Sequence, residues 1–167
     1  FLIFWINKYN KDKIVILDNI TYSANLKKIK KVIKMYSNVH FIKGDIINDN
    51  LIKKTLKKYK INYIINFAAE THVDNSIKNP NKFINTNILG TYNLLENARI
   101  YWNKSLFKKT HFHQISTDEV YGSLHKFQKS FSENSPFNPS SPYSASKASA
   151  DLIVKSYYKT FNMNITI

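Results

Sequence analysis

The chain of 167 residues is long enough for one domain with a sizeable core and too short for two large domains. Its formal net charge of +14 comes almost entirely from lysine, because Arg99 is the only arginine among 25 basic residues, so we expect a solvated lysine-rich surface with no nucleic-acid partner. The absence of cysteine excludes disulfides and thiolate chemistry and is compatible with a cytoplasmic protein, and no apolar run approaches the roughly 20 residues that a membrane span needs.

The hydrophobic pattern predicts strands and helices that alternate along the chain, after a helix tail at residues 1–9. Strands are predicted at 14–17, 39–42, 63–67 and 112–115, and helices at 26–36, 49–59, 80–99 and 142–161. The strands are nearly continuous in apolarity, which is typical of a parallel sheet that is covered on both faces. We therefore predict an α/β fold with a doubly wound parallel sheet, formed as one domain over residues 1–167.

The predicted helix at 80–99 has the clearest pattern. Asn79 is placed to cap it and Pro80 takes its first position. One apolar stripe is predicted to face the core; its members are Phe83, Ile84, Ile88, Thr91, Leu94, Leu95 and Ala98. The segment 123–141 is predicted to be an irregular loop, and loops of that length are often functional.

Polar side chains follow each predicted strand, where ligands bind in doubly wound sheets. Asp18 ends the first strand, and an acid there can accept both hydroxyls of an adenosine ribose. Asp45 follows the second strand, the segment 68–71 the third, and the segment 117–119 the fourth. Any one of these acids could serve as a helix cap or turn residue, but their recurrence at four strand ends favours a ligand site.

Tyr143 and Lys147 stand one helical turn apart at the start of the last predicted helix. Chance alone gives roughly 1.6 such pairs in a chain of this composition. Two occur, and the pair Tyr9 and Lys13 crosses a predicted element boundary, so we interpret it as accidental. At a helix start the Lys147 ammonium can lower the pKa of Tyr143, which would let the phenolate act as a base toward a sugar hydroxyl.

His111 and His113 would share one face of the fourth strand, at a spacing that suits a metal pair. No carboxylate or further histidine is placed to complete such a site. We therefore predict no metal and interpret the two as a packed, hydrogen-bonded strand pair.

Taken together, these segments resemble the extended short-chain dehydrogenase/reductase family, and within it the dTDP-glucose 4,6-dehydratases. The matching segments span nearly the whole chain in the family's order and spacing; they are 17–22, 44–46, 67–74, 87–91, 116–122 and 139–147. The resemblance implies a Rossmann-type NAD-binding domain and a hydro-lyase reaction. That reaction oxidises C4 of dTDP-glucose, eliminates water across C5–C6 and returns a hydride to C6, giving a 4-keto-6-deoxy sugar for deoxysugar and polysaccharide biosynthesis.

Residue roles follow from the resemblance by position. It implies that Asp118 is the general acid, Glu119 the general base and Tyr143 the oxidising base supported by Lys147, with substrate contacts at Thr71 and Thr117. The NAD contacts that it implies are Asp18, Asn19, Ile20, Thr21, Asp45, Ile46, Phe67, Ala68, Ala69, Glu70, Thr71, Thr86, Tyr143 and Lys147. It also implies a cytoplasmic homodimer.

Two departures from the family bear on activity. The glycine-rich dinucleotide loop and the C-terminal substrate domain of the family are not represented in the sequence, so we expect a fragment of a longer protein that is inactive alone. A UDP-glucose 4,6-dehydratase shares the acid pair and stays an alternative for the parent, whereas a 4-epimerase has no use for Asp118 and Glu119. The alternative from another class is a non-catalytic remnant that binds without turnover.

Overall fold

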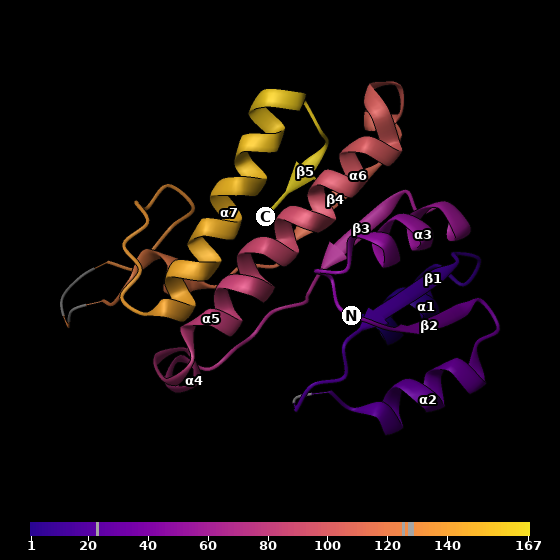
Figure 1. The fold of residues 1–167 in the computed structure, drawn as a ribbon, viewed down its shortest axis with the longest axis horizontal. Helices are drawn as coiled ribbons and strands as arrows, with labels where there is room; N and C mark the ends of the chain where they lie inside the picture. Colours follow the sequence, from indigo (N-terminus) through magenta and orange to yellow (C-terminus); the bar gives the residue numbers. More distant parts are fainter. Residues whose placement is uncertain (23, 125, 127–128) are drawn as a thin grey trace. The chain divides into compact units, whose positions relative to one another are not determined.

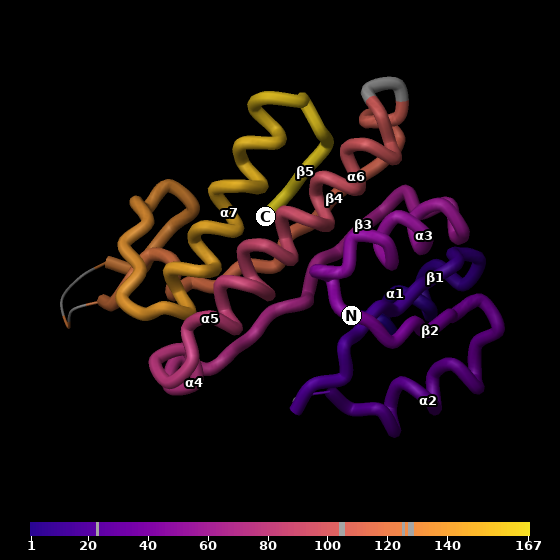
Figure 2. The backbone as a smooth tube through the Cα atoms, in the orientation of Figure 1, coloured from indigo at the N-terminus to yellow at the C-terminus, as the bar shows by residue number. Residues whose placement is uncertain are grey.

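The computed structural model describes residues 1–22, 24–124, 126 and 129–167, with the backbone alone at residues 104 and 105. The chain divides into two compact units, Phe1–Ile46 and Ile47–Ile167 (Figures 1 and 2). Each unit combines parallel strands with helices, and each is described by itself below. None of the helices in the described part of the chain has the length and apolarity that crossing a bilayer requires.

The first unit is a two-stranded parallel sheet with two helices. Its elements are α1 (Leu2–Lys8), β1 (Ile14–Asp18), α2 (Leu26–Met35) and β2 (Val39–Lys43). In the sheet, Ile14 pairs with Val39 and Asp18 with Lys43, so both strands end at the same edge. The core is formed by Ile6 of α1, Val32 of α2 and Val39, with further apolar side chains of β1 packed against it.

The second unit contains a three-stranded parallel sheet in the order β3-β4-β5. Its elements are α3 (Asp49–Tyr59), β3 (Tyr63–Asn66), α4 (Val73–Lys78), α5 (Pro80–Phe83), the π-helix η1 (Ile84–Gly90), α6 (Thr91–Leu106), the 3-10 turn η2 (Phe107–Lys109), β4 (His111–Gln114), the 3-10 turn η3 (Asp118–Tyr121), α7 (Pro142–Phe161) and β5 (Ile165–Thr166). Helices α6 and α7 lie side by side (Figure 1). The predicted parallel α/β fold is confirmed.

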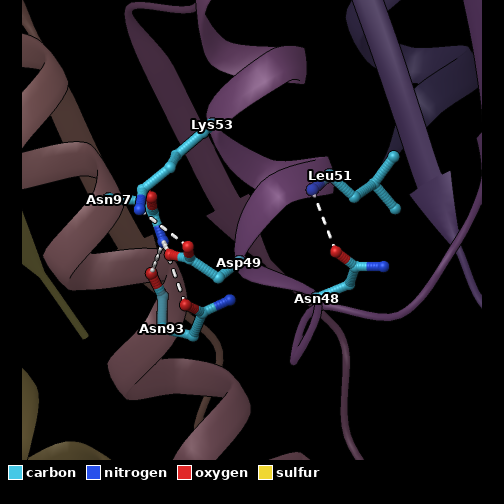
Figure 3. A network of polar contacts seen from close by, with 6 residues as sticks. All are labelled: Asn48, Asp49, Leu51, Lys53, Asn93 and Asn97. Carbon is cyan, nitrogen blue, oxygen red and sulfur yellow. Dashed lines mark hydrogen bonds and ion pairs between the residues drawn. The ribbon is translucent and has the colours of Figure 1, made fainter.

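A polar network joins α3 to α6 (Figure 3). The Asn97 amide of α6 donates to the Asp49 carboxylate of α3 over 3.0 Å and to the Asn93 carbonyl of its own helix over 2.8 Å. Asp49 also pairs with Lys53 at 2.7 Å, and the Asn48 side chain caps α3 by accepting from the Leu51 amide at 3.0 Å. The network fixes the start of α3 against the middle of α6.

The predicted helix at 80–99 is correct in place but wrong as one regular helix. It is α5, then the π-helix η1, then α6, which runs on to Leu106. A π-turn holds more residues than an α-turn, so the residues after it leave the 3.6-residue stripe. Ile84, predicted to be buried, is 48% exposed, and Asn87 is buried instead. Asn79 precedes the helix as predicted, but its side chain makes no capping hydrogen bond.

Two short elements were not predicted, α4 and β5. Strand β5 explains the two histidines of β4. The rings of His111 and His113 lie 2.9 and 2.6 Å from the same Thr166 hydroxyl, which confirms their interpretation as a hydrogen-bonded strand pair.

Candidate functional site

The segment after β4 carries two exposed acids on one short turn. The Thr117 hydroxyl accepts from the Glu119 amide at 3.3 Å and caps the 3-10 turn η3, which places Asp118 and Glu119 at its start. The turn ends at Gly122, whose φ of 95° lies in the left-handed region. A Cβ on Gly122 would stand 2.5 Å from the Asn138 carbonyl oxygen, so glycine is required there.

The other half of the site begins with a capping box. The Ser141 hydroxyl accepts from the Ser144 amide at 3.1 Å, and the Ser144 hydroxyl accepts from the Ser141 amide at 3.0 Å. With Pro142 at the first helical position, these bonds fix where α7 starts. Tyr143 therefore stands in the first turn of α7, and Lys147 stands one turn later on the same face.

Tyr143 and the segment after β4 come together. The Tyr143 ring is half-buried and packs edge-on against Phe83, with ring centroids 6.1 Å apart. Burial raises the pKa of Tyr143, a hydrogen bond with Thr117 lowers it, and the negative charges of Glu119 and Asp118 raise it. Among the described residues, these are the groups that act on its phenol. The four predicted catalytic groups on η3 and at the start of α7 are thus within electrostatic reach of one another.

The pKa of Tyr143 departs from the sequence expectation. Lys147 was expected to lower it, but the net direction is upward because burial dominates. The Lys147 amino group is nearly fully buried and donates to the Ile115 carbonyl oxygen at the end of β4. Burial lowers the pKa of Lys147, and the negative charge of Asp151 raises it.

Two buried amides hold the predicted cofactor segment 67–71. The Asn66 carbonyl oxygen accepts from the Ala68 amide at 3.2 Å, and its NH₂ donates to Gln114 and Thr91. The Asn87 side chain accepts from the Glu70 amide at 2.8 Å and donates to the Glu70 carbonyl at 3.1 Å. It also donates to the Ser146 hydroxyl of α7 at 2.8 Å. This segment is therefore tied to the helix that carries Tyr143 and Lys147.

The side chains of the segment suit a flat ligand. Phe67 is 55% exposed, and Ala68, Ala69, Glu70 and Thr71 are half-buried. Small residues at 68 and 69 leave the backbone open to close approach. Thr86, the remaining predicted contact of this unit, lies half-buried in the π-helix η1, one residue before Asn87.

In the first unit, the predicted contacts gather at the ends of β1 and β2. The Asp18 carboxylate accepts from the Ile20 amide at 2.7 Å, and the Asn19 amide donates to the Asp45 carboxylate at 2.8 Å. Ile20 has a φ of 58°, a strained value for a β-branched residue. Thr21 is exposed beside it, and Ile46 is buried at the end of the unit.

Sequence reasoning missed three buried polar residues of the second unit, namely Asn66, Asn87 and Asp151. Each carried a weak signal. Asn66 and Asn87 interrupt apolar patterns, and Asp151 stands four residues after Lys147, on the side of α7 that the core covers. A polar residue on a buried face has to find a partner, and these three find theirs in the segments around the site.

Comparison with known proteins gives consistent matches. Residues 2–167 match the family model described as GDP-mannose 4,6 dehydratase. The dTDP-glucose 4,6-dehydratase of Haemophilus influenzae is 42% identical over 169 residues, covering 99% of this chain and 50% of that protein.

Two solved structures agree with this match. The dTDP-glucose 4,6-dehydratase of Bacillus anthracis in complex with NAD superposes with a TM-score of 0.82 at 40% identity, covering 98% of this chain and 47% of that one. The Streptomyces venezuelae enzyme with NAD bound has a TM-score of 0.86 at 34% identity, with coverages of 98% and 48%. The chain spans about half the length of the curated relatives it matches.

Proposed function

Because the chain belongs to the GDP-mannose 4,6-dehydratase family, we propose that the whole protein is a hydro-lyase that dehydrates dTDP-glucose with NAD as cofactor. Relatives that are 40–42% identical carry the name dTDP-glucose 4,6-dehydratase, which favours this nucleotide sugar. Residues 1–167 would form part of its NAD-binding domain and carry its catalytic residues.

One observation carries the proposal: the charges of Asp118 and Glu119 and the hydroxyl of Thr117 all act on the Tyr143 phenol. An oxidation alone needs a base, which Tyr143 can supply. Elimination of water needs a second base and an acid, and two exposed carboxyl groups stand beside that tyrosine. This combination suits an oxidation that is coupled to an elimination.

Each group then has a defined task. Tyr143 takes the proton from the sugar O4 hydroxyl, and Thr117 hydrogen-bonds O4 as the C4 carbonyl develops. The carbonyl makes the neighbouring C5–H bond acidic, so Glu119 can take that proton. Asp118 gives a proton to the departing C6 hydroxyl, which leaves as water, and a C5=C6 double bond remains. Its reduction at C6 and protonation at C5 complete the 4-keto-6-deoxy sugar.

The residues at the strand ends fit a dinucleotide. When bound, NAD supplies the reversible oxidation and reduction that the elimination needs. In the first unit, the Asp18 carboxylate accepts from Ile20 with one oxygen, and carboxylate geometry leaves acceptor capacity for ribose hydroxyls. In the second unit, the small residues Ala68 and Ala69 allow close approach of a flat ring. The further NAD contacts that we propose are Asn19, Thr21, Asp45, Ile46, Phe67, Glu70, Thr71 and Thr86, with Tyr143 and Lys147 at the reacting end.

The proposal is tested with Glu119→Gln in the whole protein. We expect the wild type to convert dTDP-glucose to a product lighter by one water, and UDP-glucose more slowly, as measured by mass spectrometry. Glu119→Gln should abolish the loss of water and still reduce some NAD, because oxidation at C4 does not use this carboxylate. Glu133→Gln, at an exposed loop position, is the matched control. Full dehydratase turnover by Glu119→Gln would refute the assignment, and a preference for UDP-glucose would favour that alternative substrate.

We also propose that the whole protein is a cytoplasmic homodimer. Large apolar side chains stay exposed on the neighbouring helices α6 and α7, with Ile100 and Leu152 each 57% exposed. Burial of such side chains against a second copy would remove them from water. Light scattering should show a dimer that Ile100→Asp combined with Leu152→Asp converts to monomer, and cell fractionation should recover the protein with cytoplasmic enzymes.

A further inference from the structure

Asp151 is a carboxylate in the interior of the second unit. It lies on α7, one turn after Lys147, and its side chain is 1% exposed. Aspartate is rarely buried to this extent unless it is hydrogen-bonded or paired with a positive charge. Its Oδ2 accepts from the Ser116 hydroxyl. Its Oδ1 has no hydrogen-bond partner among the described residues.

The bonds around Asp151 form a double link between β4 and α7. The Lys147 amino group donates to the Ile115 carbonyl, and the Ser116 hydroxyl donates to Asp151. Two consecutive residues at the end of the strand are thus bound by two residues one turn apart on the helix. The next residue along the chain is Thr117, where the acid-bearing turn begins. This link sets the position of that turn relative to Tyr143.

The charges complete the arrangement. The pKa of Asp151 is raised by burial and lowered by the Ser116 hydrogen bond and by the positive charges of Lys147 and Lys155. The Lys147 pKa is lowered by burial and raised by the Asp151 charge. Within the described residues, the titratable groups on elements packed against α7, Asp118 and Glu119 of η3 and Glu96 of α6, are not among the groups that shift either pKa. The two buried groups therefore support each other's charged forms.

We propose that Asp151 is a positioning residue of the active site: its carboxylate holds Ser116, and with it the acid-bearing turn, against α7, and it keeps Lys147 in the ammonium form. This inference rests on the proposed function and extends it to a residue outside the substrate contacts. It separates two effects, one on geometry through Ser116 and one on charge through Lys147, and two different substitutions address them.

The first variant is Asp151→Asn in the whole protein, which keeps the shape and an acceptor for Ser116 but removes the charge. We expect kcat for dTDP-glucose to fall about tenfold with little change in KM. The alkaline limb of the kcat profile should move to lower pH, because Lys147 loses its proton more easily without the neighbouring negative charge. Glu133→Gln, which neutralises an exposed carboxylate, should leave both the rate and the limb unchanged.

The second variant is Ser116→Ala, which removes the hydrogen bond and leaves the charge. It should lower kcat and leave the alkaline limb in place, because Lys147 keeps its charged neighbour. The double variant should fall no lower than the sum of two independent losses if both act through the same link. A wild-type rate and profile in both single variants would overturn the proposal, and so would a fall in kcat with no movement of the limb in Asp151→Asn.

A further readout needs no substrate. The carbon-13 shift of the Lys147 Cε reports its protonation, and a Lys147→Arg sample identifies the signal. Asp151→Asn should lower the pH at which this signal titrates, and an unchanged titration would contradict the role of the charge. Absence of dehydration by the wild type would instead count against the proposed function, so the two failures are distinguishable. If Asp151→Asn does not fold, the Ser116→Ala profile alone decides the geometric part.

Discussion

The Asn87 side chain binds both backbone polar atoms of Glu70, accepting from its amide at 2.8 Å and donating to its carbonyl at 3.1 Å. Its remaining donor reaches Ser146 of α7. One buried amide therefore replaces a strand neighbour for the turn after β3 and links that turn to the helix of Tyr143.

Replacement of Asn87 by leucine should weaken this turn. Leucine has similar volume but leaves the Glu70 amide and carbonyl without their partner, and such a loss costs about 1–3 kcal/mol of unfolding free energy. We expect NAD affinity of the whole protein to fall about tenfold, since the turn is a proposed cofactor contact. Denaturant unfolding and calorimetric titration with NAD measure the two effects. Asn81→Leu, at an exposed position of α5, is the control; equal NAD affinity in all three proteins would rule out the role.

Gly122 should not tolerate a side chain. Alanine there would adopt a φ of 95° and would meet the Asn138 carbonyl oxygen at 2.5 Å. We expect Gly122→Ala to lower the unfolding free energy by about 1–3 kcal/mol. Ser123→Ala, at the exposed neighbouring position, should be close to neutral. Thermal unfolding of both variants checks this, and equal melting temperatures would show that the loop accommodates the methyl group.

Thr117→Val should change the pH dependence of the first chemical step. The hydrogen bond from Thr117 lowers the pKa of Tyr143, so its loss raises that pKa. Tyr143 acts as a base only when it is deprotonated, and the acid limb of the rate profile should therefore move to higher pH. The position of the limb is diagnostic, because the rate also falls when O4 loses its partner. Thr117→Ser keeps the hydroxyl and should keep the limb; movement of the limb in both variants would contradict the explanation.

The one arginine of the chain has an internal task. Arg99 binds Glu96 with two nitrogens, at 2.8 and 2.6 Å, and Tyr157 donates to the same carboxylate at 2.9 Å. Arg99→Lys keeps the charge but loses the two-pronged contact, and we expect a loss of about 1 kcal/mol in unfolding free energy at neutral pH.

The pH dependence of that loss has a defined sign. The hydrogen bond from Arg99 lowers the pKa of Glu96, so the stability from this contact is present above the unfolded-state pKa of glutamate. It disappears as the pH falls through the lower folded-state pKa. Denaturant unfolding at neutral and acid pH should therefore show the gap between wild type and Arg99→Lys closing in acid. A gap that stays constant would mean that the lost stability comes from packing of the guanidinium on Phe161, 4.7 Å from its ring centroid.

Much of the fold could be predicted because its signals are local. The sequence predicts α7 at 142–161, and the helix has these bounds, since Ser141 and Pro142 mark its start within four residues of chain. The π-turn before α6 has no such marker, because an apolar stripe of period 3.6 reads the same whether or not a wider turn interrupts it. The six residues of α4 and the two of β5 are too few to show a period at all.

The site divides in the same way. Thr117, Asp118, Glu119 and Tyr143 could be predicted to act together, because they follow a strand and open a helix. The pKa direction of Tyr143 could not, since the sequence shows its neighbours along the helix but neither its burial nor the acids that face it from η3. Asn87 and Asp151 carry partners 17 and 35 residues away, and only the folded chain shows which ones.

The π-turn between Phe83 and Thr91 also makes the length of this segment matter in whole residues. Loss of a single residue from Ile84–Gly90 would let the chain relax into a continuous α-helix and would rotate everything on one side of it by about 100° relative to the other. Thr91, Leu95 and Ala98 would then turn away from the core, or Phe83 from Tyr143. A gene that loses one codon here would thus encode a protein whose two halves of one rod point in different directions.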